Sequence, residues 1–138
     1  MARNIFRGLG IALVTPFTSN GQVDYKSLKR LVEYQIDNGA DFLCILATTG
    51  ETPCLTQDEK DKITQLVKDV NHGRLPILKG CGGNNTAAVV EELRTADWSG
   101  IDGILTSGLT LPFSLWLLSF DNIIITLFAA YVNTIFSV

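Results

Sequence analysis

The polar stretch Thr48-Thr49-Gly50-Glu51 follows the apolar run 42–46 and has residue types suited to holding an anion. Successive backbone N–H groups of such a turn can face one point, which is the geometry that binds a carboxylate. A threonine hydroxyl both donates and accepts hydrogen bonds, so a threonine here can also pass a proton to a bound keto acid. Taken without other motifs, the stretch is better interpreted as an ordinary polar turn between a strand and a helix.

A glycine-rich stretch at residues 80–85, Gly-Cys-Gly-Gly-Asn-Asn, invites comparison with a dinucleotide-binding loop. The G-x-G-x-x-G pattern of those loops requires a third glycine where Asn85 stands. We expect instead that Gly80 and Gly82 relieve steric crowding at the end of a strand, and that Asn85 or Thr86 begins a helix. The sequence therefore does not predict phosphate binding at this stretch.

Two basic residues are weaker candidates for chemistry. Lys79 follows an apolar run, and a buried lysine can form a Schiff base with a ketone. A lysine at the end of a strand is more often a solvated charge or an ion-pair partner, and we expect that role. His72, the only histidine, is expected near a helix C-terminus, where a cation interacts favourably with the helix dipole.

The cysteines are Cys44, Cys54 and Cys81. Their odd number and the absence of a C-x-x-C pair predict neither a disulfide framework nor a metal site, so we expect reduced thiols in the cytoplasm. Cys44 lies inside an apolar run and is expected in the core, whereas Cys54 and Cys81 are expected in turns as exposed thiols.

Short apolar runs alternate with segments of helical apolar spacing along the first hundred residues, which predicts an α/β protein with a parallel sheet. Asp24 is placed to cap one helix, and Thr56 with Glu59 forms the Thr-x-x-Glu capping box of the next. The expected strands are 11–14, 42–46, 76–78 and 101–105, and the expected helices begin near 24, 56 and 86 and end near 39, 73 and 96. The first strand is expected to be buried on both faces.

The length of 138 residues limits how such units can close. An open doubly wound sheet and a (β/α)8 barrel share this alternation, but a complete barrel needs roughly 200 residues or more. If the pattern is that of a barrel, the sequence supplies about four βα units, the N-terminal half.

Charge divides the chain in two, because all eleven Lys and Arg lie between Arg3 and Arg94. We therefore expect a folded domain at 1–106 and an apolar tail at 107–138. The net charge of −3 argues against nucleic-acid binding. No secretory signal is expected at the N-terminus. A membrane span is not expected either, because the uncharged run 123–138 is shorter than the roughly 20 residues that cross a bilayer.

Several motifs occur in series between about Phe6 and Leu105. They are Gly10-Ile-Ala-Leu-Val-Thr-Pro-Phe17, Gly21-x-Val-Asp24, Leu31-Val-Glu-x-Gln-Ile36, Thr48-Thr-Gly-Glu51 with Leu55-Thr-x-x-Glu59, and Gly80-x-Gly-Gly-Asn84. In this order they resemble the family of 4-hydroxy-tetrahydrodipicolinate synthases, also called dihydrodipicolinate synthases. The family belongs to the pyruvate-dependent aldolases, which include N-acetylneuraminate lyase, and Thr49 favours the synthases over the lyases.

The resemblance implies a TIM barrel, a homo-oligomer, and a lyase that condenses pyruvate with aspartate semialdehyde in lysine biosynthesis. Such an enzyme attaches pyruvate to a lysine as a Schiff base and needs no metal and no dissociable cofactor. Carried over residue by residue, the resemblance assigns Thr48 to a proton relay with tyrosines. It also assigns the substrate carboxylate to Thr48, Thr49 and Gly50.

The resemblance stops after residue 106. The family continues there with Pro-Tyr-Tyr-Asn, whereas this chain reads Ser107-Gly-Leu-Thr-Leu-Pro-Phe113, and the segment carrying the Schiff-base lysine is absent. We therefore expect a truncated synthase that is inactive as this chain. A shifted reading frame or a truncated gene product would explain the change in composition, and so would a tail that covers the barrel-interior face. Two alternatives remain open: a non-catalytic fragment that associates with a membrane or partner through residues 111–138, and another pyruvate-dependent aldolase or lyase.

Overall fold

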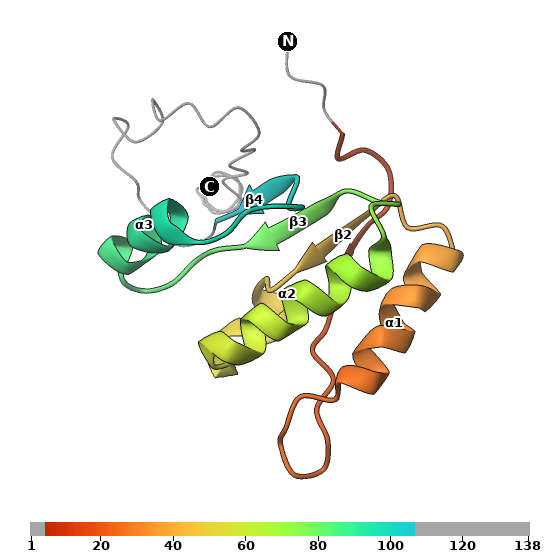
Figure 1. Ribbon diagram of the computed structural model, residues 1–138, viewed down its shortest axis with the longest axis horizontal. Coiled ribbons are helices and arrows are strands. Elements are labelled where there is room, and N and C mark those ends of the chain that lie inside the picture. The colour runs from red at the N-terminus through yellow and green to blue at the C-terminus, as the bar shows by residue number, and fades with distance from the viewer. Residues whose placement is uncertain (1–4, 107–138) are drawn as a thin grey trace, which may run out of the picture.

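The computed structural model describes residues 5–106, which form one parallel sheet and three α-helices in strict alternation (Figure 1). The strands lie in the order β1-β2-β3-β4, so each pairs with its neighbour in sequence. The predictions made for residues 107–138 lie outside the described residues. The elements are β1 (Gly10–Ala12), α1 (Tyr25–Asp37), β2 (Phe42–Ile45), α2 (Gln57–Asn71), β3 (Ile77–Gly80), α3 (Thr86–Thr95) and β4 (Gly103–Leu105), with single 3-10 turns η1 (Thr48–Gly50) and η2 (Thr52–Cys54) after β2.

The register of the sheet separates its two faces. Ile11, Leu43 and Ile77 lie opposite one another across β1, β2 and β3, and Leu43 and Ile77 are buried in the main apolar core. Side chains alternate along a strand, so the residues between them face the other way. The helices cover the face that carries Leu43, with α1 and α2 packed side by side against it (Figure 1).

The core is built where α1 and α2 meet that face. Val32, Leu43 and Val67 are fully buried there, and each such side chain contributes about 1.5–3 kcal/mol relative to an exposed position. A second, smaller cluster joins Cys81 and Ile104 to Val89 of α3. The apolar residues that recur at helical spacing therefore pack against the sheet, as the sequence predicted.

The predicted helix starts are confirmed by their caps. The Asp24 carboxylate accepts the Ser27 backbone N–H at 2.9 Å, and the Asn85 amide oxygen accepts that of Ala88 at 3.2 Å. At α2 both halves of the capping box are present between Thr56 and Glu59. These bonds satisfy first-turn amides that have no partner within their helices.

The first strand was predicted wrongly in two respects, its bounds and its burial. β1 spans Gly10–Ala12 rather than 11–14, and it is not buried on both faces, since Val14 is 50% exposed and Ala12 is exposed as well. The reason is that the described helices cover only one face of the sheet. The outer strand β4 is also shorter than predicted, because Asp102 uses its backbone N–H and its carboxylate to bond the backbone of Ile77 before the strand begins.

Two side chains on β3 and just beyond it are buried, although both were expected at the surface. Lys79 is only 5% exposed, and its ammonium lies 5.1 Å from the centre of the Trp98 ring. Cys81 is 2% exposed, because its backbone N–H still bonds the Leu105 carbonyl of the neighbouring strand. The strand runs further than the glycine-rich sequence suggested, and it carries both side chains to the helix-covered face.

Among residues 5–106, no helix combines the length and the apolar character needed to cross a membrane.

The capping box predicts a pH dependence of stability. The Glu59 carboxylate accepts the backbone N–H and hydroxyl of Thr56, and these bonds lower its pKa. A carboxyl with a lowered pKa in the folded state stabilises it above the unfolded pKa of about 4.3, and this contribution is lost as the pH falls. The difference in unfolding free energy between the wild type and Glu59→Gln should therefore be largest above about pH 5 and shrink below about pH 4.

Urea unfolding followed by circular dichroism at a series of pH values measures this difference. Val90→Ala on α3 serves as the control: it changes no ionisable group, so its effect on the unfolding free energy should stay constant over the same pH range. The expectation would be contradicted if the unfolding free energy lost in Glu59→Gln grew as the pH fell.

Candidate functional site

A hollow of about 530 Å³ lies where the carboxyl ends of the strands meet the loops that follow them. Parallel strands all present their carboxyl ends at the same edge, which is where α/β proteins place their ligands. The lining comes from the ends of β1 to β4, from η1 and η2, and from the glycine-rich stretch: Ala12, Cys44, Leu46, Ala47, Thr48, Thr49, Thr52, Pro53, Gly80, Cys81, Gly82, Gly83, Asn84 and Leu105.

The predicted site residues Thr48 and Thr49 lie exposed in this lining, at the start of η1. The amides of Gly50 and Glu51 bond the carbonyls of Ala47 and Thr48 at 2.9 and 3.1 Å. The amides of Thr48 and Thr49 come first in the turn and so have no carbonyl within it to bond. The turn therefore has two consecutive N–H donors without a partner inside it, on two residues that line the hollow.

Gly50, the third predicted residue, lies behind the other two. It is buried and does not line the hollow, and a Cβ there would meet the Leu13 carbonyl oxygen at 3.4 Å and Thr15 Oγ1 at 3.5 Å. The structure thus brings Thr48 and Thr49 together at the surface of the site and places Gly50 beneath them. Carboxylate binding by all three residues stays a prediction.

Two further threonines hold the turn, and the sequence did not single them out. The buried Thr15 hydroxyl donates to the Gly50 carbonyl at 2.7 Å, and the Thr52 hydroxyl donates to the Ala47 carbonyl at 2.9 Å. Thr15 stood out only as the residue before a proline at the end of a strand. Its bond links the segment after β1 to the turn after β2, which residue spacing alone cannot reveal.

The lining carries no charged side chain among the described residues. Its thiols are neutral as well, because burial raises the pKa of Cys44 and raises that of Cys81 to about 12, with Glu92 adding to the effect at Cys81. Attraction for an anion must therefore come from the N–H groups and hydroxyls. The described part of the chain contains no cluster of His, Cys, Asp and Glu that could hold a metal ion.

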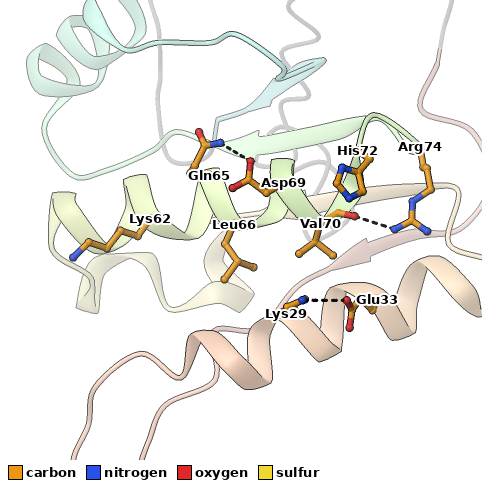
Figure 2. A pocket seen from close by; sticks show the side chains of 9 residues that line it. All are labelled: Lys29, Glu33, Lys62, Gln65, Leu66, Asp69, Val70, His72 and Arg74. Atoms are coloured by element: carbon orange, nitrogen blue, oxygen red, sulfur yellow. Dashed lines mark hydrogen bonds and ion pairs between the residues drawn. The ribbon is translucent and has the colours of Figure 1, made fainter.

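A second hollow, a groove between α1 and α2, is less suited to chemistry (Figure 2). Leu66 and Val70 extend from α2 toward α1 along it, and most of its polar groups bond one another. These bonds join Lys29 to Glu33 at 3.8 Å, Gln65 to Asp69 at 2.7 Å, and the Arg74 guanidinium to the Val70 carbonyl at 2.9 Å. His72, which caps the C-terminus of α2 in a left-handed conformation, lies at the same groove and away from the carboxyl ends.

Comparison with known proteins shows the family to which the chain belongs. Residues 5–113 match the model of the dihydrodipicolinate synthetase family. The chain belongs to this family. It is 50% identical over 107 residues to the 4-hydroxy-tetrahydrodipicolinate synthase of Phocaeicola vulgatus, a match that covers 78% of this chain and 36% of the relative. The synthase of Koribacter versatilis is also 50% identical, over 102 residues.

Solved structures of the family share the fold. The dihydrodipicolinate synthase of Thermotoga maritima superposes with a TM-score of 0.71 at 36% identity, covering 81% of this chain and 38% of that one. The N-acetylneuraminate lyase of Mycoplasma synoviae gives a TM-score of 0.68 at 27% identity, with 81% and 40% covered. The chain thus spans about a third of the length of the curated relatives it matches, and its sheet corresponds to the N-terminal part of the family's TIM barrel.

Removal of the Thr15 hydroxyl should lower the unfolding free energy of this protein. Thr15→Val keeps the shape of the side chain but removes the donor to the buried Gly50 carbonyl, which costs about 1–3 kcal/mol. Urea unfolding should show this loss, whereas Thr95→Val, exposed on α3, should change stability by less than about 0.5 kcal/mol. A Thr15→Val protein as stable as the wild type would show that the bond is unimportant.

The three thiols should differ sharply in reactivity. Cys54 is exposed on η2, while Cys44 and Cys81 are buried and have raised pKa values, so only Cys54 should react quickly with a disulfide reagent such as DTNB. Cys54→Ser should abolish the fast phase, and unfolding in guanidinium chloride should expose the remaining thiols. A fast phase that persists in Cys54→Ser would contradict the burial described here.

Proposed function

We propose that the described residues form the carboxylate-binding part of a pyruvate-dependent lyase of the dihydrodipicolinate synthase type. The reaction of that type condenses pyruvate with aspartate semialdehyde in lysine biosynthesis. The observation that carries the proposal is the pair of amides and hydroxyls of Thr48 and Thr49 at the carboxyl ends of the strands. Membership of the family supports it.

In this proposal the pyruvate carboxylate accepts hydrogen bonds from the amides of Thr48 and Thr49. An anion held by uncharged donors is favoured when the donors are fixed before it binds, because the site then needs no reorganisation. The hydroxyl bonds of Thr15 and Thr52 supply that rigidity. The Thr48 hydroxyl donates a hydrogen bond to the keto oxygen of the bound acid, at the position that the resemblance assigns to a proton relay, and the proposal requires neither a metal nor a dissociable cofactor.

We further propose that these 138 residues bind pyruvate without condensing it. A Schiff base needs a lysine amine beside the keto carbon. Every lysine of the chain lies within the described residues, and none lines the hollow; Lys79 lies on the helix-covered face against Trp98. On the family resemblance, the proposal includes that the protein is cytoplasmic and that its family is homo-oligomeric.

Titration with pyruvate tests binding directly. In a 15N-labelled chain, pyruvate should shift the amide resonances of Thr48 and Thr49, and methyl pyruvate, which lacks the carboxylate charge, should leave them unmoved. Thr48→Val, which keeps the amide and loses the hydroxyl, should weaken binding about two- to tenfold, since a hydrogen bond to the uncharged keto group contributes roughly 0.5–1.5 kcal/mol. Thr95→Val on α3 serves as the matched control.

Borohydride treatment with pyruvate, followed by mass spectrometry, tests the covalent step. We expect the mass of the chain to stay unchanged. An adduct on any lysine would overturn the non-covalent part of the proposal, and an absence of shifts at Thr48 and Thr49 at tens of millimolar pyruvate would overturn the binding site itself.

A further inference from the structure

The backbone bends sharply at the residue between β2 and the Thr48 turn. Leu46 is 4% exposed and has a φ of 51°, in the left-handed region that L-residues with a branched side chain rarely adopt. This conformation is unfavourable for a leucine and persists only where the surroundings hold it. The backbone therefore leaves the sheet at Leu46 in a conformation that leucine rarely adopts.

Gly80 on β3 is the neighbour that permits this bend. A Cβ built on Gly80 would collide with the carbonyl oxygen of Leu46, and would lie 2.6 Å from its carbonyl carbon and 2.9 Å from Cα of Ala47. All three are backbone atoms, so no side-chain rotation can relieve the clash. Gly80 thus lets the Leu46–Ala47 peptide pack directly against β3.

The Leu46–Ala47 peptide determines where the turn begins. The Ala47 carbonyl accepts both the Gly50 N–H at 2.9 Å and the Thr52 hydroxyl at 2.9 Å. A shift of Ala47 must therefore move η1 and the amides of Thr48 and Thr49 that precede its first internal bond. Thr15 holds the far end of the same turn through Gly50, so the segment after β1 and strand β3 both contact the turn region.

We infer that Gly80 is a positioning residue: its missing side chain seats the Leu46–Ala47 backbone against β3 and thereby directs the Thr48 and Thr49 amides into the hollow. Gly80 also lines the hollow, but its effect is exerted through the backbone of the neighbouring strand. The close approach of Gly80 to the Leu46–Ala47 backbone follows from the structure alone, and the assignment of pyruvate as the ligand of the amides rests on the function proposed above.

Gly83 provides a matched control from the same lining. A Cβ on Gly83 would meet only Val89 Cγ2, at an ordinary distance of 3.5 Å, so alanine fits there without displacing the backbone. The two glycines share the glycine-rich stretch and differ in what their Cβ would touch. A general loss of loop flexibility would affect both substitutions, whereas a positional effect appears only at Gly80.

The experiment compares 15N amide spectra of the wild-type chain, Gly80→Ala and Gly83→Ala. Gly80→Ala should move the Thr48, Thr49 and Gly50 resonances and weaken pyruvate binding at least tenfold. Gly83→Ala should leave these three resonances in place, and Thr95→Val on α3, outside the hollow, should leave the affinity within twofold of wild type. Unmoved Thr48 and Thr49 resonances in a folded Gly80→Ala chain would overturn the inference. If the wild type does not respond to pyruvate but Gly80→Ala still moves the turn, the proposed function fails and the inference stands.

A measurement on the wild type covers the case in which Gly80→Ala does not fold. The close approach predicts a nuclear Overhauser contact between the α-protons of Gly80 and Ala47, and a positive φ at Leu46 from its amide–Hα coupling and sequential contacts. Absence of the contact between Gly80 and Ala47 in the folded wild-type chain would overturn the inference as directly as an unmoved turn.

Discussion

The site depends on the packing of α1 and α2 against a single face of the parallel sheet. Val32 of α1 and Val67 of α2 are fully buried there with Leu43 of β2. This contact aligns the strands so that their carboxyl ends share one edge. The loops that follow them must then converge, and the hollow with its turn at Thr48 results from that convergence.

The opposite face of the sheet serves a different purpose. Gly80 lies there without a side chain, because a Cβ would meet the backbone of Leu46 and Ala47. The helix-covered face carries the main apolar core, while Gly80 gives the backbone before η1 room to approach β3. Leu46 combines a backbone conformation that is unfavourable for leucine with a buried side chain.

Much of this was predictable from residue types. Alternating apolar runs indicated the α/β order, and Asp24, Thr56 and Asn85 mark helix starts by simple local chemistry that the structure confirms. Local spacing could not reveal how far β3 runs, so Lys79 and Cys81 were expected at the surface although both are buried. Nor could it reveal Thr15, because the partner of that hydroxyl lies 35 residues further along the chain.

The bond from Thr15 to Gly50 also bears on the order of assembly. It joins segments that meet only after β1 and β2 have paired, and the room that Gly80 provides exists only once β3 has joined them. Long-range contacts of this kind form late, because the entropy of closing the intervening chain must be overcome first. A nascent polypeptide that has emerged only as far as the turn therefore lacks the shape of the hollow, which is completed at the end of folding.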